Sequence, residues 1–124
     1  MILSLSTRDE LTNFQAQLVN NGFFNIYNIN DILLCSIQLK HKAFNNSTGG
    51  TARLDVNGGL YSIPILNGTA SYFNMCDYEN NIKWNGLFGL TSSDAEAKIS
   101  SLTIDTNIPV SIISYALTTP SGEI

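Results

Sequence analysis

The chain has 124 residues, 44% of them hydrophobic, which is enough for one ordinary domain and too few for two well-filled cores. Only 13% of the residues are charged, about half the usual share, and the formal net charge is −4. The six basic residues are scattered and form no stripe, which argues against nucleic-acid binding. Fifteen asparagines supply much of the polarity, so the surface suits turns, strand edges and protein contacts.

The N-terminus and the apolar runs bear on where the protein resides. Residues 1–6 lack the basic region and the apolar stretch of a secretory signal. No run approaches the roughly 18 apolar residues of a membrane span. We therefore expect a protein made in the cytoplasm, with no signal peptide and no membrane partner.

The first expected element is a helix over about residues 8–20. Thr7 followed by Glu10 matches a capping box, in which each side chain bonds the backbone of the other residue. Asn21-Gly22 supplies residues that tolerate the left-handed conformation at a helix end. The pattern predicts one N-terminal helix.

The expected helix carries a narrow apolar stripe. Leu11, Phe14 and Leu18 recur at helical spacing, and Val19 widens the stripe. Such a stripe needs a surface to lie on. That surface is either the domain's own sheet or a neighbouring subunit.

After Gly22 the apolar period changes from that of a helix to that of strands. The strongest local signal spans 51–76, which reads as three strands joined by tight turns, a meander. Asn67-Gly68 suits a type I′ hairpin, and Pro64 indicates an edge strand or a bulge. Other expected strands lie at 23–29, 33–40, 82–90 and 102–105.

The last third of the chain continues the strand pattern. Gly86 leaves room for a bulge or for aromatic packing, between Ile82, Trp84 and Phe88, which share one parity. Residues 91–96 form a loop that could contain a helical turn. Residues 110–117 are apolar on both faces, which favours a central strand or one covered by a partner. An extended tail is expected over about 118–124.

About eight short strands at regular spacing predict a mainly β protein. The expected fold is an antiparallel β-sandwich or small barrel, Ig-like or jelly-roll-like, with one N-terminal helix. No linker interrupts residues 1–124, so a single domain is expected.

The residues that usually carry catalysis or hold metals are sparse. The only histidine, His41, stands between two lysines and reads as a solvated loop residue. Cys35 and Cys76 lie in apolar strand-like runs, which favours buried free thiols over a disulfide. Carboxylates such as Asp77 fall in turns. We expect no catalytic site, no cofactor and no metal, and therefore not an enzyme.

Aromatic residues are the better lead to a binding site. Tyr78, Asn80, Asn81 and Trp84 combine rings with amides, as sugar-binding modules do. The alternative is that Trp84 belongs to the core. One hypothesis is therefore a carbohydrate-binding β-sandwich, lectin-like or receptor-binding, with these four residues as its glycan contact.

The other hypothesis is a structural role. Low charge, an Asn/Ser/Thr-rich surface, strand 110–117 and a separately capped helix suit a β-domain that builds or decorates an assembly. In these features the chain resembles small accessory proteins of tailed-phage virions, such as head-decoration proteins and tail or fibre adaptors. The resemblance implies a capsid or tail component, present as a homo-oligomer among other protein subunits.

Overall fold

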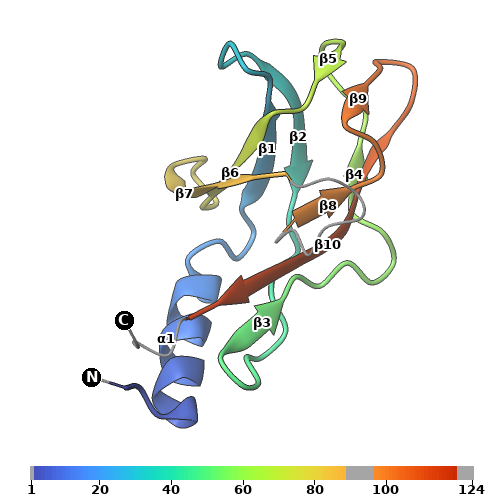
Figure 1. The fold of residues 1–124 in the computed structure, drawn as a ribbon. Coiled ribbons are helices and arrows are strands. Elements are labelled where there is room, and N and C mark those ends of the chain that lie inside the picture. The colour runs from blue at the N-terminus through green and yellow to red at the C-terminus, as the bar shows by residue number, and fades with distance from the viewer. Residues whose placement is uncertain (1, 89–96, 120–124) are drawn as a thin grey trace.

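The computed structural model describes residues 2–88 and 97–119, and the chain is mainly β with one helix (Figure 1). The sheets are antiparallel and, in the described residues, do not close into a barrel, which is consistent with the expected β-sandwich. The elements are α1 (Leu5–Gln17), β1 (Phe23–Tyr27), β2 (Leu33–Gln38), β3 (Thr51–Arg53), β4 (Tyr61–Ser62), β5 (Gly68–Thr69), β6 (Tyr72–Cys76), β7 (Ile82–Leu87), β8 (Ala97–Ile99), β9 (Thr103–Ile104) and β10 (Val110–Thr118).

The first sheet has the strand order β2-β1-β6-β7. Phe24 in β1 pairs with Ile37 in β2 and with Met75 in β6, and all three are fully buried. Paired residues of antiparallel strands point to the same face, so this face of the sheet meets the core. The expected strands at 23–29 and 33–40 are confirmed, each slightly shorter than predicted.

The second sheet is built around β10, which pairs with β3, β4 and β8. The apolar run 110–117 is therefore a central strand, one of the two alternatives that its pattern leaves open. A small third sheet joins β5 to β9, which covers part of the expected strand at 102–105. The extended tail predicted over 118–124 and the loop at 91–96 lie largely outside the described residues.

An aromatic cluster joins the two sheets. Phe24 stacks on Phe73 with ring centroids 4.6 Å apart, and Tyr115 of β10 meets Phe73 edge-on at 5.3 Å. Gly86 of β7 pairs with Phe73, and a methyl group on Gly86 would lie only 2.3 Å from the Phe73 ring. Gly86 is thus a glycine that makes room for an aromatic ring, one of the two roles its position predicts.

The helix begins three residues before its predicted start. Ser4 is the N-cap, and its Oγ accepts from the backbone N–H of Thr7 at 3.1 Å. The predicted Thr7–Glu10 capping box is therefore wrong, because Thr7 is already inside the first turn. The helix ends at Gln17, before its predicted end near residue 20, and Asn21 takes the left-handed conformation that the stop signal predicts.

The meander predicted over 51–76 is wrong. β3 and β4 do not pair with each other but both pair with β10, and β6 pairs with β1 and β7 in the other sheet. The segment Asn67-Gly68 is no hairpin turn, since Gly68 opens β5, which pairs with β9. The alternating pattern identified these segments as extended, but β3 and β4 pair with the long strand β10 and not with their neighbours in the sequence.

Candidate functional site

Three of the four predicted glycan contacts lie on the turn between β6 and β7. Asp77 Oδ1 accepts from the backbone N–H groups of Glu79 at 3.0 Å and Asn81 at 2.9 Å. The bond from Asn81 is the main reason why the pKa of Asp77 is lowered. Tyr78 extends into solvent and is 68% exposed. This turn is ordered by its own aspartate.

Asn80 is directed back toward the sheet and serves the structure. Its Oδ1 accepts from Nδ2 of Asn25 at 3.0 Å, and Asn25 is buried. Oδ1 of Asn25 in turn accepts from Oγ of Ser36 at 2.5 Å. The side-chain oxygen of Asn80 is thus used to satisfy a buried amide, as buried polar groups require.

Trp84 lies on the core-facing side of the first sheet, opposite to the side on which Asn80 contacts Asn25. It pairs with Met75 on the core side, and its Nε1 donates to the hydroxyl of Tyr115 at 2.7 Å. A register shift between Met75 and Cys76 separates Trp84 from Ile82, which is exposed, so the single parity predicted for these two residues is wrong. The structure does not bring Trp84 together with Tyr78, Asn80 and Asn81.

The cysteines are buried, whereas the only histidine is exposed. Cys35 and Cys76 are free and buried, and burial raises the pKa of both thiols. His41 is exposed, with its Nδ1 3.0 Å from Nδ2 of Asn21. Within residues 2–88 and 97–119, no three His, Cys, Asp or Glu side chains gather as a metal site would require.

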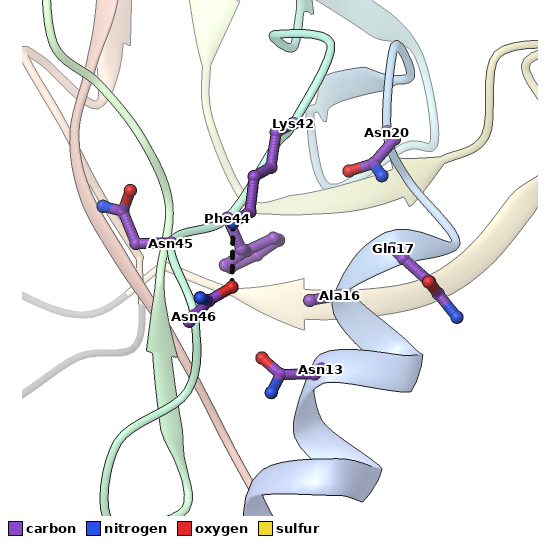
Figure 2. A pocket seen from close by; sticks show the side chains of 8 residues that line it. All are labelled: Asn13, Ala16, Gln17, Asn20, Lys42, Phe44, Asn45 and Asn46. Carbon is purple, nitrogen blue, oxygen red and sulfur yellow. Dashed lines mark hydrogen bonds between the residues drawn. The ribbon is translucent and has the colours of Figure 1, made fainter.

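A pocket of about 170 Å³ lies between α1 and the segment 42–46, and Figure 2 shows the side chains around it. Two of the lining residues, Ala16 and Phe44, are apolar. The other six carry amide or ammonium groups. They are Asn13, Gln17, Asn20, Lys42, Asn45 and Asn46.

Two amides on the helix side of the pocket, those of Asn13 and Asn20, accept hydrogen bonds from the backbone of residues 43–47. Oδ1 of Asn13 accepts from the backbone N–H of Ser47 at 2.8 Å. Oδ1 of Asn20 accepts from the backbone N–H of Ala43 at 2.9 Å. Because both partners can only donate, the amide oxygens must face them, and the orientation of each amide is fixed.

The opposite wall is arranged in the same way. Nζ of Lys42 donates to Oδ1 of Asn46 at 2.8 Å (Figure 2). An ammonium group can only donate, so the NH2 group of Asn46 points elsewhere. The side chains of Asn45 and Gln17 form no hydrogen bond within the described part of the chain.

Sequence reasoning did not single out this pocket, although half of the signal is visible in the sequence. Asn13, Gln17 and Asn20 are spaced by four and three residues, which places them on one face of a helix. Asn45 and Asn46 are adjacent in a polar loop. Only the path of that loop past the helix brings the two groups together.

The apolar stripe of α1 forms a second distinctive surface. Leu11, Phe14 and Leu18 are 47%, 61% and 38% exposed, so no surface of the described chain covers them, whereas Val19, which was predicted to widen the stripe, is fully buried. The helix packs instead through Thr12 and Ala16. Thr12 is fully buried, and its Oγ1 lies 2.7 Å from the carbonyl oxygen of Arg8, 3.2 Å from that of Gly50 and 2.5 Å from Oγ1 of Thr119.

No helix among the described residues is long and apolar enough to cross a membrane. Comparison with known protein families, with curated proteins and with solved structures finds no match to this chain.

Proposed function

We propose that this chain is a non-enzymatic assembly protein, a β-domain that builds or decorates a larger symmetric particle such as a phage virion. The observation that carries the proposal is the exposed stripe of α1. Leu11, Phe14 and Leu18 form a contiguous apolar surface on a helix whose opposite face is already packed. Exposed apolar patches on ordered elements mark sites of protein contact.

A second apolar surface suggests what covers the first. Ile63, Ile65 and Leu66, between β4 and β5, are 59%, 58% and 47% exposed. In Figure 1, β5 lies at the end of the molecule opposite to α1. Two different patches at opposite ends suit a head-to-tail contact between copies of the chain, which closes into a ring when the rotation between copies allows it. The proposed partner of the helix stripe is therefore segment 63–66 of the next copy.

The low charge of the chain fits the same role. With 13% charged residues and a net charge of −4, long-range repulsion between copies is weak. Contacts of this kind rest on apolar area and on neutral polar groups around it.

Light scattering of the purified chain tests the proposal. The wild type should form oligomers, and the combined substitutions Leu11→Ser, Phe14→Ser and Leu18→Ser should yield monomers with an unchanged circular dichroism spectrum, because exposed positions contribute little to folding. Glu10→Ala on the same helix is the matched control and should leave assembly unchanged.

A mixing experiment tests the head-to-tail arrangement. A variant with Ile63→Ser and Ile65→Ser keeps its helix stripe, and the helix variant keeps segment 63–66. Each variant alone should be monomeric, whereas the mixture should give dimers that grow no further. A wild type that stays strictly monomeric at high concentration would refute the assembly role.

A further inference from the structure

The pocket between α1 and segment 42–46 is lined by six residues with amide or ammonium groups and by two apolar residues. Most small-molecule pockets are largely apolar with a few polar groups, whereas polar and apolar atoms share the lining of this one. Its preferred occupant is therefore a molecule that offers both hydrogen-bonding groups and carbon-bound hydrogens.

Three amides of the lining, those of Asn13, Asn20 and Asn46, have fixed orientations and can act only as donors to a ligand. Their oxygens are held by protein donors, so the NH2 groups remain, and no partner contacts these NH2 groups in the described residues. Asn13 and Asn46 are exposed residues, and Asn20 is partly exposed. The open donor atoms are Nδ2 of Asn13, Asn20 and Asn46.

Gln17 and Asn45 complete the wall with adaptable groups. In Figure 2 both amides point outward from the space between α1 and segment 42–46. Neither side chain is tied to the protein within residues 2–88 and 97–119, so each can rotate and offer an amide oxygen and an NH2 group to a ligand. Ala16 and Phe44 supply the apolar part of the lining, against which carbon-bound hydrogens can pack.

We propose that this pocket binds one unit of a neutral saccharide. A sugar hydroxyl both accepts and donates, so it can take a bond from a fixed NH2 group and give one to Gln17 or Asn45. The ligand should be neutral because Lys42 is the only cation of the lining, its ammonium is already bonded to Asn46, and the chain as a whole is acidic.

A neighbouring hollow extends the proposal to a longer glycan. A second cavity of about 200 Å³ is also lined by Asn45 and Asn46, together with Thr48, Thr51 and Arg53. The two asparagines therefore border both cavities, and the second can accept the next saccharide unit. This assignment is independent of the assembly role, because it uses neither the helix stripe nor segment 63–66.

Nuclear magnetic resonance on the ¹⁵N-labelled chain tests the inference. Glucose, galactose, mannose and N-acetylglucosamine are titrated separately, and the side-chain NH2 signals of the pocket amides are followed. At least one of the sugars should shift these signals saturably. The double variant Gln17→Ala, Asn45→Ala should weaken that binding by about tenfold or more, because it removes hydrogen bonds to the ligand without removing one within the protein.

The control is Gln38→Ala, which removes an exposed amide from β2 and should leave the affinity unchanged. The inference is overturned if none of the four sugars shifts the pocket signals, or if the double variant binds as tightly as the wild type. It is also overturned if the shifts fall on the Tyr78 turn, or if glucuronate binds more tightly than glucose, which would indicate an anion site.

Discussion

Gly86→Ala should destabilise the fold, although alanine is usually less unfavourable than glycine in the interior of a strand. The new Cβ would lie 2.3 Å from Cζ of Phe73 and 2.7 Å from its Cε1, well inside van der Waals contact. The ring cannot move away easily, because it is stacked on Phe24 and meets Tyr115 and Phe88. Overpacking of this kind costs about 1–3 kcal/mol.

Two smaller effects adjust this magnitude. Alanine in a strand interior gains about 0.5–1 kcal/mol over glycine. Displacing the Phe73 ring forfeits aromatic contacts of about 0.5–1.5 kcal/mol. These two effects roughly cancel, so the net loss is about 2 kcal/mol, which for a chain of this size lowers Tm by about 8 °C. Thermal and urea unfolding followed by circular dichroism measure it.

A double-mutant cycle identifies the cause. If the clash with the ring is the reason, Gly86→Ala should cost much less in a Phe73→Leu background, because the smaller side chain leaves room for the methyl group. Equal costs in the two backgrounds would show that the ring is not the source, and the steric reasoning would be refuted.

Two further predictions concern titratable groups. Asp9 accepts from Oγ of Ser47 and from the N–H of Gly50, both at 2.7 Å, and these bonds lower its folded pKa. Its contribution to stability is therefore present above the unfolded pKa of about 3.9 and is lost as pH falls through the lower folded value. Asp9→Asn should reduce stability at pH 7 and make the unfolding midpoint fall less steeply as the pH is lowered. The same pH dependence in wild type and variant would contradict this. Cys35 and Cys76 are buried with raised pKa values, so a thiol reagent should label them only as fast as the protein opens, and immediate labelling of the native chain would contradict their burial.

The helix was predictable as an element but not in its orientation. The spacing of Leu11, Phe14 and Leu18 indicates an amphipathic helix, and a helix lies there. Its buried face is nevertheless set by Thr12, whose hydroxyl contacts Gly50 and Thr119, two partners that are distant in the sequence. Long-range hydrogen bonds of this kind leave no periodic trace in a sequence.

The strands were predictable as extended segments but not in their pairing. Val110 to Leu117 is apolar on both faces, which favours a central strand or one covered by a partner, and β10 is central. The segments of 51–76 alternate correctly, yet alternation says nothing about which strand lies alongside. The candidate site shows the same limit, because the bulge beside Met75 places Ile82 on the exposed face, whereas strict alternation places it on the same face as Trp84.

The way α1 is attached separates folding from the proposed assembly. Arg8 donates from Nε to the carbonyl oxygen of Thr119 at 3.0 Å, and Thr12 lies within hydrogen-bonding distance of Thr119 Oγ1 and the carbonyl oxygen of Gly50. These bonds and the Asp9 contacts hold the helix against the end of β10 and the loop before β3 through polar groups. If the helix were attached through its apolar stripe, substitutions in the stripe would also detach it from the domain. Because this helix uses its polar face inward, the apolar face is free to change with little effect on the fold, which is the property that a subunit contact requires.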